Sequence, residues 1–389
     1  MKKLQIAVVS DLHCHHSSLE PSETMLLTDA SRLPSSQHPV QSLLDLIKKD
    51  KLSANILLMP GDITNKVDPQ GLNSGWGFVG EIAKALNVET LAPTLGNHDV
   101  NSRKPEGDPF KLVKGLSPKF PTSTDPVFDQ FWSKGFCLLE GDDYRVLVVN
   151  SATSHTDEKA AKQGFVSPQL LDDISQALTK APLKQFQIAV CHHHPMLHED
   201  IGLGKSDVME NGSLLTQLLT EKGFHLLVHG HKHHPKLSYA PGAQALPVLA
   251  AGSFSAGMKN GIASRTRNVF HSICLEYCEE SKIMRGNIST WQFRLSIGWT
   301  PATWEAVDFP HKTGFGSSIV PEQLADQVHK LFSSLNVPVA DWRTVVHSVP
   351  DLKYVLPSTF EKVGILLNAK GLNLQPPPPD EPQYIGKSS

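Results

Sequence analysis

Five short clusters of Asp, Asn and His side chains recur along this chain, and each directly follows a short apolar run. Short apolar runs bounded by turn residues predict buried strands. Because strand ends gather along one sheet edge in α/β folds, the five clusters are expected to meet in one place. The clusters are Asp11-Leu12-His13, Gly61-Asp62, Gly96-Asn97-His98-Asp99, His192-His193-His194 and Gly230-His231-Lys232-His233.

Buried strands and amphipathic helices alternate along most of the chain. This alternation is typical of an α/β fold with helices on the sheet faces. The last three predicted strands follow one another without helices between them, which indicates two packed sheets rather than one. We expect strands at 4–9, 55–59, 90–95, 144–149, 187–191, 225–228, 246–250, 269–277 and 290–297, helices at 38–49, 76–86, 167–180, 213–222 and 321–335, and a long loop at 101–126.

The chain changes character after about residue 298. Its 389 residues suffice for one large domain or two ordinary ones, since domains have roughly 100–200 residues. We expect a main domain over 1–298 and a smaller C-terminal extension over 299–375 that acts as a lid, an oligomerisation element or a partner-binding region. The proline-rich end cannot pack a core, so 376–389 is expected to be a flexible tail.

Composition and charge exclude several classes of protein. Lys and Arg number 36 against 39 Asp and Glu, a net charge of −3, so no bulk basic field attracts nucleic acid, although a local basic groove stays open. The 40% hydrophobic content allows a sizeable core. Five scattered cysteines fit reduced thiols better than a disulfide framework. The first apolar run is too short for a signal peptide and no stretch could span a membrane, which predicts a cytoplasmic protein without membrane contact.

The side chains in the five clusters predict a metal site. They supply more carboxylate, amide and imidazole ligands than one ion needs and no thiolate, which indicates a two-metal hydrolytic centre. Asp11 and His13 lie two residues apart after the first strand, so both can lean into one site. His231 and His233 repeat this spacing after a later strand. Asp62 also follows a strand, and its carboxylate can bridge two cations.

The order Asp-x-His, Gly-Asp, Gly-Asn-His-Asp, a histidine and Gly-His-x-His resembles the calcineurin-like metallophosphoesterase superfamily. The similarity runs from Leu4 to about Ser253, where Gly252-Ser253 is similar to a Gly-Ser pair that often follows the last motif. It implies a four-layer α-β-β-α sandwich of two mixed sheets flanked by helices. The catalytic domain would then occupy residues 1–298.

The resemblance also implies ligands for two divalent cations. Three adjacent histidines compete for one position, and the family's usual His-x-Pro placement ahead of Pro195 favours His193 over His192 and His194. Mn²⁺ or Fe would suit these ligands, with Zn²⁺ or Ni²⁺ as alternatives. The first metal would be bound by Asp11, His13, Asp62 and His233, and the second by Asp62, Asn97, His193 and His231.

The chemistry implied by the resemblance is in-line attack on phosphorus by a hydroxide that bridges the two metals. His98 resembles the family histidine that contacts the phosphoryl group and protonates the leaving oxygen. Asp99 would orient that imidazole and raise its pKa. Asn97 and His98 would both contact the substrate. Arg265 and Arg267 could contact its phosphate, although a solvated turn explains them equally well.

Other polar residues near the clusters are expected to play supporting roles. Asn65 stands where relatives often have Asp, and we expect it to cap a helix or to hydrogen-bond beside the site. Cys14 is expected to be a small buried filler. The histidines expected in loops or behind the ligands are His15, His16, His192, His194 and His234.

The favoured function is hydrolysis of a small phosphodiester such as a cyclic nucleotide, because the His-His-Pro run resembles the cyclic-nucleotide phosphodiesterase branch. A nuclease and a phosphoprotein or phosphomonoester phosphatase are alternatives, and the charge disfavours long duplexes. An amidohydrolase-type metal hydrolase would explain His13-Cys14-His15 but not Gly96–Asp99. A non-catalytic binding module is disfavoured because no ligand is missing. The oligomeric state stays open.

Overall fold

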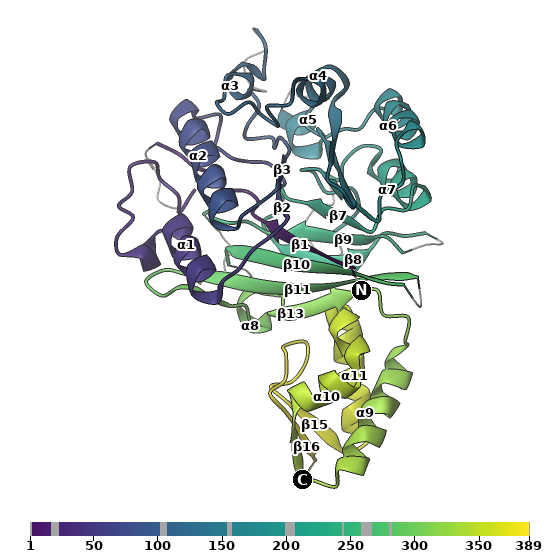
Figure 1. The fold of residues 1–389 in the computed structure, drawn as a ribbon. Coiled ribbons are helices and arrows are strands. Elements are labelled where there is room, and N and C mark those ends of the chain that lie inside the picture. The colour runs from purple at the N-terminus through teal and green to yellow at the C-terminus, as the bar shows by residue number, and fades with distance from the viewer. Residues whose placement is uncertain are drawn as a thin grey trace.

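The computed structural model describes residues 2–16, 23–101, 107–153, 158–198, 207–242, 245–257, 267–279 and 282–388. Figure 1 shows a large α/β unit above a smaller C-terminal unit, which contains the end of the chain. The two units have separate apolar cores.

The first sheet has seven strands in the order β12-β11-β10-β1-β2-β3, and β13 also pairs with β11. Strands β1, β2 and β3 run parallel, whereas β10 to β13 add antiparallel pairs. The strands span Lys2–Val8 (β1), Ile56–Met59 (β2), Thr90–Pro93 (β3), Val269–Cys278 (β10), Ile283–Arg294 (β11), Gly298–Pro301 (β12) and Lys312–Phe315 (β13).

The second sheet has six strands in the order β4-β5-β6-β7-β9-β8. Its four central strands run parallel and the two edge strands are antiparallel. The strands span Phe136–Glu140 (β4), Tyr144–Val149 (β5), Phe186–Val190 (β6), Leu226–His229 (β7), Pro235–Tyr239 (β8) and Pro247–Ala251 (β9).

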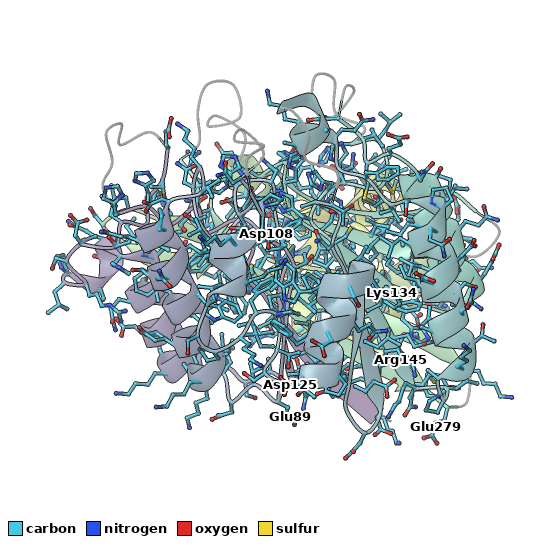
Figure 2. All side chains as sticks on the ribbon, turned by 90° about the horizontal axis from the view of Figure 1, so that it is seen from above. Glu89, Asp108, Asp125, Lys134, Arg145 and Glu279 are labelled. Atoms are coloured by element: carbon cyan, nitrogen blue, oxygen red, sulfur yellow. The ribbon has the colours of Figure 1, made fainter. Side chains whose placement is uncertain are left out.

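Alternate residues of β5 explain how the layers pack. Val146 and Val148 belong to the large core between the sheets, while Leu147 and Val149 face the helices on the outer side. Successive side chains of a strand point to opposite faces, so a strand covered on both faces is apolar throughout. From above, the purple helices of the N-terminal segment and the teal helices of the middle segment lie on opposite sides (Figure 2).

The helices α1 and α2 cover the first sheet, and α6 and α7 cover the second (Figure 1). Ser167 caps α6, as expected, by accepting a hydrogen bond from the Leu170 amide at 3.0 Å. None of the helices in the described ranges is both long and apolar enough to cross a membrane. The helices of this unit are η1 (Ser35–Gln37), α1 (Pro39–Asp50), α2 (Pro69–Ala85), α3 (Lys111–Lys114), α4 (Asp125–Lys134), α5 (Glu158–Gln163), α6 (Pro168–Lys180), α7 (Gly212–Glu221) and α8 (Trp304–Val307).

The four-layer sandwich of two mixed sheets flanked by helices is therefore confirmed. The edge strands β4, β8 and β12, and also β13, had no counterpart in the expected elements, and the expected loop at 101–126 contains α3 and the start of α4. Edge strands are harder to recognise because only one neighbour and part of one face constrain their sequence.

The C-terminal unit combines three α-helices with a three-stranded antiparallel sheet of order β14-β16-β15. Its core includes Val328, Trp342 and Val363. Its elements are α9 (Pro321–Leu335), β14 (Val339–Asp341), α10 (Trp342–Ser348), η3 (Pro350–Tyr354), α11 (Pro357–Ala369), β15 (Leu372–Gln375) and β16 (Tyr384–Lys387).

Two expected boundaries need correction. The main domain does not end at residue 298, because β12 and β13 both pair with β11 and extend the first sheet to Phe315. The end of the chain is not a flexible tail, since β16 pairs with both β14 and β15 and buries Ile385 completely. The proline run connects β15 to β16, in which Ile385 is the buried residue.

The C-terminal unit packs against the outer side of the first sheet near β10 and β13 (Figure 1). The Tyr354 hydroxyl donates to Glu276 Oε2 at 2.6 Å, and Lys3 Nζ lies 2.7 Å from the other oxygen of that carboxylate. The Gly314 amide also donates to the Val355 carbonyl at 3.0 Å. A cleft of about 610 Å³ remains between the two units.

Candidate metal centre

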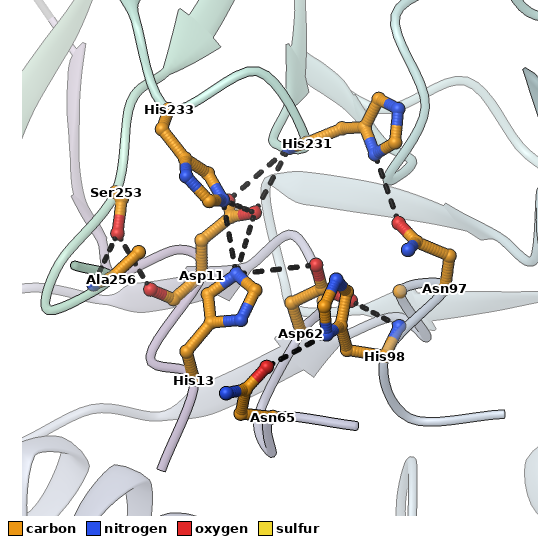
Figure 3. A network of polar contacts seen from close by, with 12 residues as sticks. Asp11, His13, Asp62, Asn65, Asn97, His98, His231, His233, Ser253 and Ala256 are labelled. Atoms are coloured by element: carbon orange, nitrogen blue, oxygen red, sulfur yellow. Dashed lines mark hydrogen bonds and ion pairs between the residues drawn. The ribbon is translucent and has the colours of Figure 1, made fainter. Parts of the chain in front are cut away.

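All five clusters meet at one edge of the two sheets, where the parallel strands end. Asp11 and His13 follow β1, Asp62 follows β2, and Asn97 follows β3. From the second sheet, the histidine run at 192–194 follows β6 and the pair at 231 and 233 follows β7. Segments about 220 residues apart thus contact one another. Figure 3 shows His13 and His233 beside Asp11, and His231 beside Asn97.

The first group of side chains contains Asp11, His13, Asp62 and His233, whose ligand atoms all lie within 4.8 Å of one another. Nε2 of His13 lies 3.0 Å from Nε2 of His233 and 3.4 Å from Asp62 Oδ2. Nε2 of His233 lies 3.3 Å from Asp11 Oδ1. Two imidazole nitrogens and two carboxylates that converge in this way form a ligand set suited to a divalent cation.

The second group forms around Asn97. Its Oδ1 lies 3.1 Å from His192 Nε2 and 2.9 Å from His231 Nδ1. His192 Nε2 also lies 3.5 Å from Asp62 Oδ2. A second cation would meet an amide oxygen, two imidazoles and a carboxylate oxygen here.

Asp62 stands between the two groups. The same Oδ2 faces His13 on one side and His192 on the other, while Oδ1 accepts a hydrogen bond from the His98 amide at 2.8 Å. Burial, and then the nearby charges of Asp11 and Asp99, raise the pKa of Asp62 well above its ordinary value. Bound cations would offset this cost by stabilising the ionised carboxylate.

The backbone at the ligands is held in an uncommon conformation. Asp11, His13, Asp62, His231 and His233 all have positive φ angles, between 49° and 81°. Residues with a Cβ seldom adopt this region because Cβ crowds the backbone. Such conformations cost on the order of 1–3 kcal/mol each and concentrate where surrounding structure holds a binding site.

Two glycines allow the strand ends to approach this closely. A Cβ on Gly96 would lie 2.0 Å from Asp62 Oδ1, and a Cβ on Gly230 would lie 2.4 Å from Asp11 Oδ2. Gly252-Ser253 also supports the site, because the Ser253 hydroxyl donates to the Asp11 carbonyl at 2.8 Å (Figure 3).

Hydrogen bonds distinguish His192 from His193. His192 Nδ1 lies 2.7 Å from the Pro60 carbonyl, which can only accept, so Nδ1 carries the proton and Nε2 presents a lone pair to the centre. His193 instead has Nε2 at 3.0 Å from the Ala161 carbonyl and Nδ1 at 2.8 Å from the Ser151 hydroxyl. His192, His193 and His231 each offer a ligand atom within 4.8 Å of the others. Both ring nitrogens of His193 also contact Ser151 or Ala161, so the hydrogen bonds favour His192 over the expected His193 as the ligand.

Burial lowers the pKa of His13 and of His192 well below the ordinary value, and neighbouring histidines lower both further. The ring of His13 is therefore neutral at physiological pH, as a metal-binding imidazole must be.

The pKa of Asp11 shifts in the direction opposite to the one that burial favours. Burial alone would raise the pKa of Asp11, but the hydrogen bond and charge of His233, with His13, outweigh burial and lower it. An anionic Asp11 is the protonation state that a cation requires.

His98 lies next to the first group, with its ring edge-on to His13 at 4.6 Å between centroids. Its Nδ1 lies 3.0 Å from Asn65 Oδ1 (Figure 3). Burial, and then the charges of His233 and His231, lower the pKa of His98 to about 3. The expectation that a neighbouring carboxylate raises this pKa is not met, because the ring partner is the neutral amide of Asn65.

The Asp99 carboxylate contacts backbone amides instead of the His98 ring that it was expected to orient. Its Oδ1 accepts from the Thr64 amide at 3.0 Å and its Oδ2 accepts from the Gly96 amide at 2.9 Å. Burial raises the pKa of Asp99 to about 7, even though backbone amides, first that of Gly96, lower it. The carboxylate therefore fixes the two loops that carry Asp62 and Asn97, rather than orienting His98.

The remaining expected residues contribute to neither group within the part of the chain that the structure describes. Arg267 is exposed, and Arg265 lies outside the described residues. His16 Nδ1 lies 2.9 Å from Asp68 Oδ1, and this carboxylate caps α2 through the Gly71 amide. His15, His16 and Asp68 form a further group that could hold an ion, but the capping role already explains the carboxylate.

Sequence reasoning did not predict that His192 Nε2 lies beside Asn97 and Asp62, nor which side chain Asn65 contacts. The motif placed a histidine at this point, but nothing local in His192-His193-His194 shows which ring turns inward. Asn65 was expected to hydrogen-bond near the site, and the structure identifies His98 as its partner.

Part of this sequence matches the profile of a known protein family. Residues 4–235 match the profile of a family described as calcineurin-like phosphoesterase. None of the curated proteins matches the sequence.

The solved structures to which this chain shows similarity are distant in sequence. A purple acid phosphatase from yellow lupin seeds is 10% identical, with a TM-score of 0.47; the match covers 81% of this chain and 54% of that one. GAP50, the anchor in the inner membrane complex of Plasmodium, is 11% identical, with a TM-score of 0.36; the match covers 77% of this chain and 90% of GAP50. A phosphopantetheinyl hydrolase from Mycobacterium tuberculosis is 11% identical, with a TM-score of 0.34; the match covers 64% of this chain and 89% of the hydrolase. This chain thus spans about half the length of the lupin enzyme.

The family profile covers more than half of the chain and includes all five clusters. The chain belongs to the calcineurin-like phosphoesterase family.

Proposed function

We propose that this protein is a phosphoesterase with two divalent cations in its centre. The observation that carries the proposal is the position of Asp62, whose Oδ2 lies 3.4 Å from His13 Nε2 and 3.5 Å from His192 Nε2. One carboxylate oxygen between the imidazoles of His13 and His192 is the arrangement that a shared bridging ligand needs.

The proposed ligands differ from the initial expectation at one residue, since His192 replaces His193. Each group supplies oxygen and nitrogen atoms only, which suits Mn²⁺ or Fe, with Zn²⁺ or Ni²⁺ as alternatives. The proposed ligands of the first metal are Asp11, His13, Asp62 and His233, and those of the second are Asp62, Asn97, His192 and His231.

Two cations bound there would polarise the phosphoryl oxygens and lower the pKa of a water molecule in the centre. Asn65 fixes the ring of His98 through Nδ1, so Nε2 is available to contact the phosphoryl group or the leaving oxygen. His98 and His233 are partly exposed, whereas Asp11, Asp62 and His192 are buried. A substrate would therefore approach from the side of His98 and His233.

We propose a small phosphodiester, such as a cyclic nucleotide, as the substrate. The support is the His-His-Pro run and the absence of a basic surplus in the sequence, which disfavours long nucleic acids. A phosphomonoester is the alternative within the same chemistry.

Metal analysis combined with a substrate panel tests this proposal. Purified protein loaded with Mn²⁺ should contain two metals per chain and hydrolyse bis(p-nitrophenyl) phosphate faster than p-nitrophenyl phosphate. Cyclic nucleotides and a short oligonucleotide complete the panel. Asp62→Asn should lower kcat/KM by at least about 100-fold, because it removes the shared anionic ligand.

Asp129→Asn is a matched control, because Asp129 is an exposed carboxylate on α4, and it should leave kcat/KM unchanged. The proposal fails if the protein turns over no phosphoester with any of the four metals. Full activity of Asp62→Asn would contradict the assigned centre, and preference for the monoester would overturn only the choice of substrate.

A further inference from the structure

One ring nitrogen in the second group is not explained by metal binding. His231 directs Nδ1 toward Asn97 Oδ1 at 2.9 Å. Its Nε2 is buried and makes no hydrogen bond within the part of the chain that the structure describes. If Nδ1 presents a lone pair to a cation, Nε2 carries the proton and needs an acceptor.

Asp207 provides the nearest side-chain acceptor. Its Oδ2 lies 3.8 Å from His231 Nε2 and its Oδ1 lies 3.7 Å from His194 Nε2. The carboxylate is mostly buried, with 14% of the side chain exposed. The backbone carbonyl of Lys162 also lies close to the His231 ring, so it is the competing acceptor.

Lys232 also contacts the Asp207 carboxylate. Its ammonium forms an ion pair with Oδ2, the same oxygen that faces His231. Lys232 lies between His231 and His233 in the sequence. The loop that supplies two proposed ligands therefore also supplies the cation that holds Asp207 beside one of them.

The other histidine of the second group has the same kind of support. His192 Nδ1 donates to the Pro60 carbonyl at 2.7 Å, and this contact orients its opposite nitrogen. A metal-binding histidine usually donates its remaining N–H to a carboxylate or carbonyl, which fixes the tautomer and the ring orientation. His231 would lack such support without an acceptor at Nε2.

We propose that Asp207 is a positioning residue that orients His231 for the second metal, with Lys232 holding the carboxylate in place. This inference rests on the proposed two-metal centre. The contact is longer than a hydrogen bond in the structure, and we expect it to shorten when a cation draws the His231 ring into place.

The test compares Asp207→Ala, Asp207→Asn and Asp207→Glu with the wild type. Glu210→Ala is the matched control, because Glu210 is an exposed carboxylate three positions away. The affinity of each chain for Mn²⁺ is measured by competition with a chelator, and metal content by elemental analysis. Thermal unfolding of the metal-free proteins shows whether the fold itself has changed.

Asp207→Ala should weaken the affinity for one of the two Mn²⁺ ions by about 10–100-fold and leave the other unchanged. Asp207→Glu should restore part of the loss, because a carboxylate returns, and Asp207→Asn should be intermediate. The unfolding temperature of the metal-free protein should not change in Asp207→Asn or in Glu210→Ala.

Wild-type affinity for both ions in Asp207→Ala would overturn the inference and leave the Lys162 carbonyl as the acceptor. Equal weakening of both ions, or weakening in Glu210→Ala, would also overturn it. Failure of the proposed function is a separate result, because the wild-type protein itself would then bind fewer than two metals.

Discussion

At the residue scale, the choice among three adjacent histidines shows how hydrogen bonds assign roles to identical side chains. His192 uses one nitrogen on the Pro60 carbonyl and keeps the other for the centre. His193 uses both nitrogens, on Ser151 and on Ala161. An imidazole has only two nitrogens, so these contacts support the proposal that His192 is the ligand and His193 a structural residue.

We predict different losses for the two alanine variants. His192→Ala should bind one metal fewer and lower kcat/KM by about 100-fold or more. His193→Ala should keep both metals but lose about 2–4 kcal/mol of unfolding free energy, because it opens a buried cavity and removes the ring contacts to Ser151 and Ala161. Metal content, kinetics and urea unfolding measure these effects.

His347→Ala is the control for both variants, because His347 is exposed on α10 in the C-terminal unit. It should match the wild type in metal content and in stability. If His193→Ala lost a metal while His192→Ala retained both, the hydrogen-bond argument would be wrong.

At the scale of elements, one histidine links the two sheets of the sandwich. His271 in β10 of the first sheet directs Nε2 to the Ala251 carbonyl in β9 of the second sheet at 2.9 Å. Its Nδ1 lies 2.8 Å from the Thr290 hydroxyl in β11. Burial lowers the pKa of His271 to about 4, so the folded protein holds this ring neutral.

This shift predicts a loss of stability in mild acid. Above about pH 6.5, the ordinary pKa of histidine, His271 is neutral in both states and adds no pH dependence. As the pH falls from about 6.5 toward 4, the unfolded chain takes up a proton that the folded protein excludes, so unfolding becomes easier. The contribution at pH 5 is on the order of 2 kcal/mol.

The measurement is urea unfolding of the wild type and His271→Gln at pH 7.5 and pH 5. Glutamine can still donate toward Ala251 but does not titrate. The drop in unfolding free energy between the two pH values should be smaller in the variant by about 2 kcal/mol. An equal drop in both proteins would rule out His271 as the source.

At the scale of the whole molecule, the C-terminal unit is attached to the sandwich by polar contacts around one carboxylate. Glu276 in β10 accepts from the Tyr354 hydroxyl at 2.6 Å and pairs with Lys3 at 2.7 Å. Burial would raise the pKa of Glu276, but the hydrogen bonds from Lys3 and Tyr354 outweigh burial and lower it.

We therefore predict that Tyr354→Phe loosens the C-terminal unit without affecting the metal centre. Losing a buried hydrogen bond to a charged group should cost about 1.5–3 kcal/mol. Hydrogen exchange should become faster in residues 317–388 while kcat/KM stays at the wild-type value. Tyr384→Phe is a suitable control, because this tyrosine is half-exposed on β16. Unchanged exchange in Tyr354→Phe would show that other contacts hold the unit.

The sequence alone determined the layers and the neighbourhood of the site. Periodicity identified the central strands of both sheets and the helices α1, α2, α6, α7 and α9, because a strand covered on both faces must be apolar and a helix covered on one face must be amphipathic. The order of Asp11, Asp62, Asn97 and His231 after successive strands predicted that they meet, since parallel strands end at one sheet edge.

The tertiary structure decided what depends on partners distant in the sequence. His192 turns inward because the Pro60 carbonyl holds its other nitrogen, and the two residues are 132 positions apart. Asn65, not Asp99, contacts His98, because the Thr64 and Gly96 amides already bind the Asp99 carboxylate. Tyr384–Lys387 forms a strand only because β14 and β15 lie beside it. Each of these outcomes depends on a hydrogen-bond partner that local sequence does not contain, so only the folded chain could decide it.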